Sequence, residues 1–287
     1  MNESNRWRRV DPPERPVLFV NPASGGGTAD RAGLVERARV RSIAVRVFGH
    51  GVDLAALAAD EVARGADALG VAGGDGSLAI VAAAALAHGL PFVCIPAGTR
   101  NHFALDMGVD RRDVVGALDA FTDGLERRID VAEVNDRVFL NNVSLGIYGD
   151  AVRQPTYRDA KARTLLETTA QTLGPSSAAL DLQLVDDRGH TYHDPAVVLV
   201  SNNPYSLQPP RAPGTRPTLD SGRLGIIVLD KPRAGPSPGR SWTATRFEVT
   251  APAPVDAGVD GEAVELVPPL RFAIRPRALR VRIPRRA

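Results

Sequence analysis

The chain has 287 residues, of which 44% are hydrophobic and 24% are charged, and its formal net charge is +2. This is the composition of an ordinary soluble globular protein with a sizeable core, and the length suggests two domains. Arginines and acidic residues are largely interspersed, without the concentrated basic patch of a nucleic-acid-binding protein, so we expect no nucleic-acid partner.

The cellular compartment can be inferred from the cysteine count and the hydropathy. Cys94 is the single cysteine, which excludes an intramolecular disulfide and fits a reducing compartment. The first residues are polar and rich in arginine, unlike a signal peptide. No apolar run is long enough to span a bilayer. We therefore expect a cytoplasmic protein without a transmembrane segment.

Strand-like and helix-like segments alternate in the first part of the chain. In order, they are a strand over Pro16–Val20, a helix over Thr28–Arg39, a strand over Ile43–Phe48, a helix from a cap at Asp53 to Arg64, a strand over Ala68–Ala72, a helix over Leu78–His88 and a strand over Pro91–Ile95. This alternation predicts an open parallel sheet covered by helices. Ligands of such folds bind at loops that leave the carboxyl ends of strands, where three glycine-bearing loops occur here.

After about residue 130 the pattern changes to short strands separated by turns. The expected strands are Arg128–Val134, Val138–Val143, Ala179–Val185, Ala196–Ser201, Leu224–Leu229 and Thr245–Thr250. In this half only Tyr157–Leu173 has the pattern of a helix. Several strands with little helix between them predict an antiparallel β-sandwich.

The loop after the first strand reads Asn21-Pro22-Ala23-Ser24-Gly25 and continues with two further glycines. Glycines let the backbone approach a phosphate closely and direct its N–H groups inward. The alternative is a flexible turn. The loop is not a Walker A loop, because no lysine followed by serine or threonine comes after it.

The second loop, Gly73-Gly74-Asp75-Gly76-Ser77, places three glycines around one carboxylate between a buried strand and a helix. It suits a backbone cradle for a triphosphate, with Asp75 able to interact with the Mg²⁺ of that triphosphate. The alternative role for Asp75 is that of a helix N-cap. The third loop, Pro96–Asn101, offers the hydroxyl of Thr99 and the amide of Asn101, which can bind a nucleotide or cap a helix.

In this order, the patterns N-P-x-S-G, G-G-D-G-S/T and P-x-G-T-x-N resemble the diacylglycerol kinase catalytic family. That family includes bacterial lipid kinases, sphingosine kinases and ceramide kinases, and is related in fold to NAD kinases. The resemblance extends from about Pro16 to Pro284. It implies an α/β ATP-binding domain over residues 1–130 and a β-sandwich domain for lipid binding and catalysis over residues 131–287. A strand at about 279–284 would return to the first domain, and ATP would bind between the domains.

The resemblance also implies roles for particular residues. Asn21–Gly25 and Gly73–Ser77 would hold the phosphates of ATP, and Thr99 and Asn101 would line the nucleotide site. The segment Leu140–Gly146 is similar to the family motif that helps to shape the cleft.

Taken by themselves, the two carboxylates of Val259-Asp260-Gly261-Glu262 would be solvated acids in a turn. The resemblance implies that Glu262 accepts the proton of the lipid hydroxyl, with Asp260 orienting it or sharing that role. Sphingosine-type relatives give the role of base to the acid of the second loop, so Asp75 is the second candidate. Family members often bind a structural Mg²⁺ where Asp220 lies, but Ser221 replaces the usual second acid, and we expect that metal to be weak or absent.

The resemblance therefore implies transfer of the γ-phosphate of MgATP to a lipid hydroxyl by an enzyme associated peripherally with the membrane. Diacylglycerol is the first acceptor to consider. The alternatives are a kinase of the same fold acting on a sphingoid base, a polyprenol or a soluble polyol, and a nucleotide-binding regulator without catalysis. The oligomeric state stays open, a homodimer included.

Overall fold

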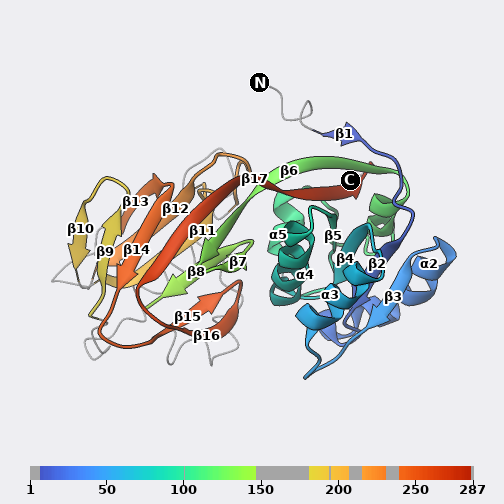
Figure 1. Cartoon of the computed structure of the whole chain (residues 1–287), viewed down its shortest axis with the longest axis horizontal. Coiled ribbons are helices and arrows are strands. Elements are labelled where there is room, and N and C mark those ends of the chain that lie inside the picture. Colours follow the sequence, from blue (N-terminus) through green and yellow to red (C-terminus); the bar gives the residue numbers. More distant parts are fainter. Residues whose placement is uncertain are drawn as a thin grey trace. The chain divides into compact units, whose positions relative to one another are not determined.

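The computed structural model describes residues 7–99, 101–146, 181–193, 195–206, 215–230 and 239–285. The chain divides into two compact units, Met1–Ile129 with Arg277–Ala287, and Asp130–Pro276. Two long strands, β6 (Gly124–Val134) and β17 (Leu270–Pro284), contribute residues to both units (Figure 1). The expected helix Tyr157–Leu173 lies outside the described residues. Within the described ranges, no helix is both long enough and apolar enough to cross a membrane.

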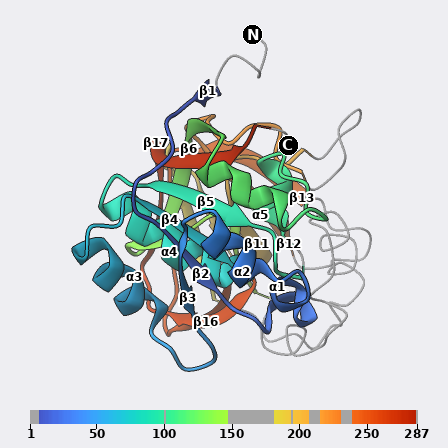
Figure 2. The same ribbon diagram turned by 90° about the vertical axis from the view of Figure 1, so that its right-hand side faces the viewer.

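The first unit is built on a parallel sheet. Its strands are β2 (Pro16–Val20), β3 (Ala44–Val47), β4 (Ala68–Ala72), β5 (Pro91–Ile95) and the last part of β17, in the order β17-β5-β4-β2-β3. Every residue of β2, β4 and β5 is buried, as continuous apolar runs predict for strands covered on both faces. The short strand β1 (Arg8–Arg9) pairs with β6, which also pairs with β17 (Figure 2).

Helices connect these strands much as the sequence predicts. They are α1 (Thr28–Arg31), α2 (Leu34–Val40), α3 (Leu54–Ala63), α4 (Asp75–Ala87) and α5 (His102–Asp106), with 3₁₀ turns η2 (Ser24–Gly26) and η3 (Gly116–Phe121). Helix α4 packs on β4 and β5 beside α3. Asp53 caps α3 by accepting a hydrogen bond from the N–H of Ala56 at 3.0 Å, as predicted. The single helix expected over Thr28–Arg39 is wrong, because the left-handed Gly33 (φ 59°) separates α1 from α2.

Strand pairs of the second unit are antiparallel. One sheet has the order β13-β12-β11-β8-β15-β16, with β8 (Asn142–Leu145), β11 (Pro195–Asn202), β12 (Leu224–Asp230), β13 (Gly239–Ala244), β15 (Val255–Val259) and β16 (Glu262–Leu266). The other strands are β9 (Gln183–Asp186), β10 (Thr191–His193) and β14 (Arg246–Thr250), which pair with one another and with the first part of β17, and β7 (Arg137–Phe139), which pairs with β6. The predicted fold class, a parallel α/β part followed by an antiparallel β part, is confirmed.

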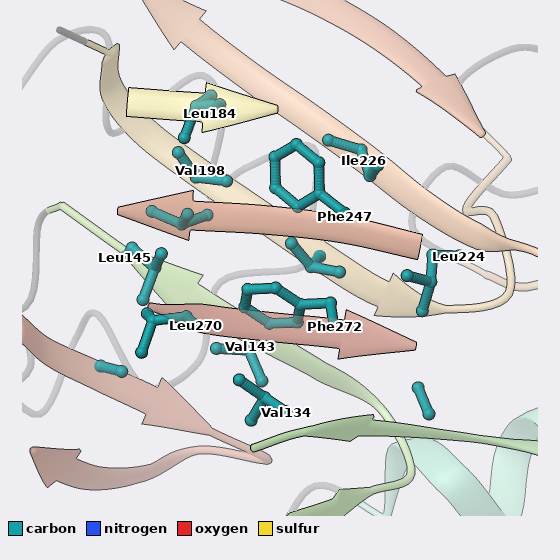
Figure 3. Packing of buried hydrophobic residues seen from close by; sticks show 14 of the residues in the cluster. Val134, Val143, Leu145, Leu184, Val198, Leu224, Ile226, Phe247, Leu270 and Phe272 are labelled. Atoms are coloured by element: carbon teal, nitrogen blue, oxygen red, sulfur yellow. The ribbon is translucent and has the colours of Figure 1, made fainter. Parts of the chain in front are cut away.

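The core of the second unit follows from the two-residue period of its strands. Val143 and Leu145 of β8 face the same core as Phe247 of β14 and Phe272 of β17 (Figure 3). The ring centroids of Phe247 and Phe272 lie 5.9 Å apart. Since alternate side chains of a strand point to opposite faces, one face of each sheet is apolar and the two apolar faces pack together.

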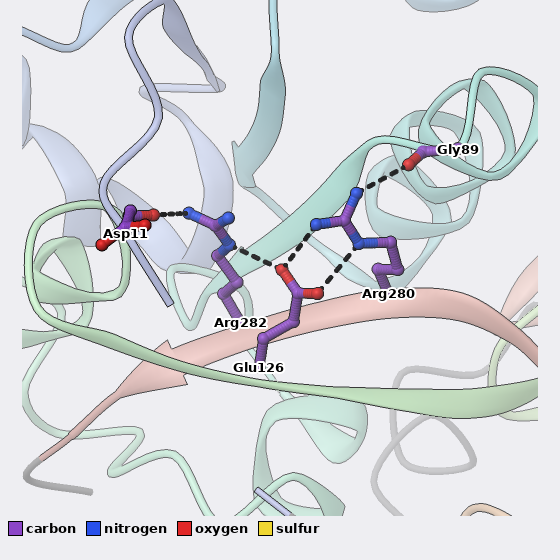
Figure 4. A network of polar contacts seen from close by, with 5 residues as sticks. All are labelled: Asp11, Gly89, Glu126, Arg280 and Arg282. Atoms are coloured by element: carbon purple, nitrogen blue, oxygen red, sulfur yellow. Dashed lines mark hydrogen bonds and ion pairs between the residues drawn. The ribbon is translucent and has the colours of Figure 1, made fainter. Parts of the chain in front are cut away.

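A buried carboxylate ties β17 to the rest of the first unit (Figure 4). Glu126 of β6 is only 1% exposed and accepts hydrogen bonds from Arg280 at 2.9 and 3.0 Å and from Arg282 at 2.9 Å. The two guanidinium groups also donate to backbone carbonyls, Arg280 to Gly89 and Arg282 to Asp11, both at 3.1 Å. Four segments that are distant in sequence are thereby joined.

Candidate active site

The loop between β2 and α1 forms a left-handed turn of three glycines. Gly25, Gly26 and Gly27 have φ values of 59°, 66° and 89°, which side chains other than glycine rarely adopt. Asn21 begins the loop, with its side-chain oxygen accepting the N–H of Ala23 at 3.1 Å and its own N–H donating to Ala72 at the end of β4 at 2.9 Å. The local sequence therefore favours the structured, glycine-dependent turn over a flexible one.

The second loop is shorter than its sequence suggests, because α4 already begins at Asp75. The N-cap is Gly74, which provides no side-chain cap, so the expected alternative of Asp75 as N-cap is wrong. Gly76 and Ser77 belong to the first turn of the helix. A side-chain carbon built on Gly74 would have no atom within 4 Å, so open space lies beside this helix end. An uncapped N-terminus beside open space favours an anion.

The third loop is held together by Asn101. Its amide oxygen accepts the N–H of Gly98 at 2.9 Å, and its amide nitrogen donates to the carbonyls of Pro96 at 3.2 Å and Gly98 at 2.7 Å. Asn101 precedes α5 in a left-handed conformation (φ 51°), but its side chain makes no capping bond. The amide therefore shapes the loop, while Thr99 beside it is exposed.

Glycines bring the three loops into direct contact. A side-chain carbon on Gly25 would lie 2.5 Å from the carbonyl oxygen of Ala97. One on Gly98 would lie 2.8 Å from the carbonyl oxygen of Gly73 and 2.9 Å from the Cα of Gly74. Only glycine permits such approaches. The loops that the sequence singled out thus meet at the carboxyl ends of three neighbouring parallel strands, β2, β4 and β5.

Asp75 carries a negative charge into this group of loops. Burial raises the pKa of the neighbouring Cys94 thiol, and the charge of Asp75 raises that pKa further. Cys94 is therefore a neutral core residue, while Asp75 is the acid that could support a metal ion beside the helix end.

In the second unit, Asp260 and Glu262 occupy different environments. The turn between β15 and β16 is formed by Asp260 (φ 50°) and Gly261 (φ 87°), and Glu262 is the exposed first residue of β16. Asp260 is only 6% exposed, so the expectation that both acids are solvated is wrong for this one. Its carboxylate accepts the backbone N–H groups of Leu140 at 2.8 Å, Asn141 at 2.7 Å and Asn142 at 3.1 Å.

The same contacts explain why the expected strand Val138–Val143 is interrupted. Strand β7 ends at Phe139 and β8 begins at Asn142. The N–H groups between them bond to Asp260 instead of to a neighbouring strand.

Around Asp220, where the resemblance implied a structural Mg²⁺, the side chains are hydrogen-bonded within the protein. Asp220 contacts the hydroxyl of Thr218, and the hydroxyl of Ser221 donates to the side-chain oxygen of Asn203 at 2.6 Å. The N–H of Gly222 donates to the buried Asp130 at 2.6 Å. Across the described residues, no three His, Cys, Asp or Glu side chains gather as a metal site would need. A weak or absent metal at Asp220 stays a prediction.

Sequence reasoning missed several buried polar residues of the second unit, namely Asp130, Asn202, Asn203 and Arg216. Asn202 and Asn203 follow the apolar run of β11, and polar residues at the end of a buried strand were the available signal. Arg216 lies in a proline-rich stretch without any such signal.

Several known proteins are similar to this chain in sequence or in fold. Residues 15–134 match the model of the "Diacylglycerol kinase catalytic domain" family. Over 293 aligned residues the chain is 28% identical to "Probable lipid kinase YegS-like" of Pseudomonas aeruginosa, with 94% of this chain and 95% of the relative covered. It is 35% identical over 124 residues to "Diacylglycerol kinase" of Mycobacterium tuberculosis, with 42% and 40% covered.

One solved structure, of a diacylglycerol kinase from Bacillus anthracis, is similar with a TM-score of 0.65 and 18% identity. The match covers 94% of this chain and 96% of that chain. It shows that the two share a fold along nearly their whole lengths.

Proposed function

We propose that the chain is a lipid kinase of the diacylglycerol kinase catalytic domain family. In this proposal it transfers the γ-phosphate of ATP, bound with Mg²⁺, to the hydroxyl of diacylglycerol, giving phosphatidic acid. Kinases of this family use ATP. The family description and the Mycobacterium tuberculosis relative favour diacylglycerol as acceptor. We further propose that the enzyme acts at the membrane surface, where this acceptor lies.

The observation that carries the proposal is the contact of three glycine loops at the carboxyl ends of β2, β4 and β5. Backbone N–H groups are the donors that phosphates prefer, and they are offered by the uncapped start of α4 at Gly74 and by the glycine turn that begins at Gly25. No atom lies within 4 Å of a side-chain carbon built on Gly74, so a phosphate group can approach this helix end. Residues of the first unit thus fit the phosphates of ATP, and Asp75 fits a carboxylate ligand of Mg²⁺.

In the proposed reaction, Glu262 accepts the proton of the lipid hydroxyl as that oxygen forms a bond to the γ-phosphorus. The bond from the γ-phosphorus to the bridging oxygen breaks, and ADP leaves with that electron pair. Glu262 suits this role because it is exposed, whereas both oxygens of Asp260 accept backbone N–H groups. When bound, Mg²⁺ neutralises charge on the phosphate oxygens. Asn101 keeps the third loop in shape, and Thr99 offers its hydroxyl to the nucleotide.

The test is phosphorylation of defined lipids with labelled ATP. Mixed micelles carrying diacylglycerol, a sphingoid base or a polyprenol, and glycerol in solution, are compared at equal concentration. We expect labelled phosphatidic acid as the main product. Label in another acceptor would replace diacylglycerol in the proposal, and ATP binding without any labelled product would indicate a regulator without catalysis.

Two variants then separate the base from the metal support. Glu262→Gln keeps size and removes basicity, so we expect a loss of about 10²–10⁴-fold in kcat with little change in ATP affinity. Asp75→Asn should weaken the binding of MgATP and also lower kcat. Glu265→Gln, an exposed carboxylate on the same strand β16, is the matched control and should behave as wild type. If Glu262→Gln kept full activity while Asp75→Asn abolished it with ATP still bound, Asp75 would be the base.

A further inference from the structure

A short backbone segment of the second unit, Leu140–Asn142, is held between two buried side chains of opposite charge. On one side, the carboxylate of Asp260 accepts all three N–H groups of the segment at 2.7–3.1 Å. On the other side, the guanidinium of Arg216 donates to the carbonyl of Leu140 and, at 2.8 Å, to the side-chain oxygen of Asn141. Arg216 is 4% exposed and Asp260 is 6% exposed.

Neighbouring groups complete the hydrogen bonding of this segment. Asn202 donates its backbone N–H to the carbonyl of Asn141 at 3.0 Å and its amide to the carbonyl of Leu140 at 3.2 Å. The N–H of Asp260 donates to the carbonyl of Asn142 at 2.9 Å. Each carbonyl and each N–H of the three residues therefore has a partner, as buried backbone requires.

Arg216 also lies near the ring of Tyr205, which bonds the same segment. Its guanidinium lies 6.0 Å from the ring centroid of Tyr205, and the Tyr205 hydroxyl accepts the amide of Asn142 at 2.9 Å. A planar fork of donors can bond several carbonyls and stack on a ring at once, which the point charge of lysine cannot do.

We propose that Arg216 and Asp260 form a clamp of positioning residues that fixes Leu140–Asn142 and, through the turn at Asp260, sets the position of Glu262. The inference rests on the proposed role of Glu262 in the reaction. Glu262 follows Asp260 by two residues, and the intervening Gly261 completes a tight left-handed turn. Val259, the pairing partner of Glu262, is itself paired with Val143, directly after the clamped segment.

The geometry gives Asp260 a different task from Glu262. Asp260 holds backbone with charge-assisted hydrogen bonds, which are shorter and stronger than neutral ones. Asp260 is only 6% exposed and both of its oxygens accept backbone N–H groups, so it is less accessible to a substrate hydroxyl than the exposed Glu262. Loosening the clamp would instead let Glu262 shift, and a misplacement of about 1 Å can lower a rate by about 100-fold.

The test compares Asp260→Asn, Arg216→Lys and the double variant Asp260→Asn/Glu262→Gln with wild type and Glu262→Gln. We expect both single clamp variants to lose about 10- to 100-fold in kcat with little change in the KM for ATP. We expect the double variant to be no slower than Glu262→Gln alone, because a residue that acts through Glu262 adds nothing once that base is gone.

The matched control is Asp186→Asn. Asp186 is also a buried carboxylate of the second unit and accepts the backbone N–H groups of Arg188 and His190, both at 2.9 Å. Its loss should lower the melting temperature and leave kcat per folded molecule unchanged. Clamp variants that fold and keep kcat like this control would overturn the proposal. The proposal would also be overturned if the kcat of the double variant were below that of Glu262→Gln by the same factor that Asp260→Asn alone loses relative to wild type.

Hydrogen exchange tests the clamp without any substrate. In Asp260→Asn and in the milder Arg216→Lys, the amides of Leu140–Asn142 should exchange faster, while the β9–β10 hairpin stays unchanged. Asp186→Asn should show the reverse. Unchanged exchange at Leu140–Asn142 in either clamp variant would refute the clamp, whereas a wild-type protein that phosphorylates no lipid would refute the proposed function instead.

Discussion

Removal of the Glu126 carboxylate should destabilise the first unit strongly. In Glu126→Ala, the guanidinium groups of Arg280 and Arg282 lose three hydrogen bonds of 2.9–3.0 Å, and Arg282 is itself only 7% exposed. Breaking a buried ion pair by removing one partner costs about 3–5 kcal/mol, because the other charge stays buried without compensation. For a unit of this size, that loss lowers the melting temperature by on the order of 10 °C.

The assay must report on the first unit alone, since two units need not unfold together. The two tryptophans permit this, because Trp7 belongs to the first unit, where Arg127 lies 4.8 Å from its ring centroid, and Trp242 belongs to the second. Urea unfolding followed by Trp7 fluorescence in a Trp242→Phe background therefore measures the relevant free energy.

Glu36→Ala is the matched control within the same unit. The side chains of Glu36 and of its partner Arg39 are 74% and 59% exposed. Such exposed ion pairs contribute about 0–1 kcal/mol to the free energy of unfolding. If Glu126→Ala cost no more than Glu36→Ala, the reasoning from burial would be refuted.

The dependence on pH gives an independent check. Burial by itself would raise the pKa of Glu126, but the hydrogen bonds from Arg280 and Arg282 lower it below the ordinary value of 4.5. Because the folded-state pKa is depressed, the stabilisation is fully present above about pH 4.5 and is lost as the pH falls through the folded-state pKa. The gap in unfolding free energy between wild type and Glu126→Gln should therefore shrink only in acid. A gap that grew toward low pH would contradict this assignment.

Two further outcomes follow from single residues of the first unit. Gly74→Val should fold normally, because open space surrounds the new side chain, and should weaken MgATP binding measured by calorimetry, because that space is the proposed phosphate site. Gly49→Val, also with open space around it, is the control, and equal affinity in both variants would count against the site. Cys94 should resist iodoacetamide at pH 8 in the native state and react in urea, since burial and the charge of Asp75 raise its thiol pKa; rapid native labelling would disprove this.

The sequence by itself determined the strands that are buried on both faces. Pro16–Val20, Ala68–Ala72 and Pro91–Ile95 have the predicted bounds, because a proline or glycine follows each apolar run within two residues. The three glycine loops followed directly, since they leave the ends of these strands. The start of α4 at Asp75 was misjudged because two residues of its first turn, Gly76 and Ser77, are poor helix formers.

Other features depend on partners far away in the chain, so only the tertiary structure decided them. Strand β17 was identified in its last part alone, by resemblance, because arginines and a proline mask its period and its neighbours β14 and β5 are distant in sequence. Asp260 reads as a solvated turn acid, yet it is buried because its carboxylate meets N–H groups about 120 residues earlier. Arg216 reads as part of a proline-rich loop, yet it bonds Leu140, 76 residues away. A local pattern records which face of an element is apolar, whereas a buried charge is stable only where the fold supplies its counter-charge and hydrogen bonds.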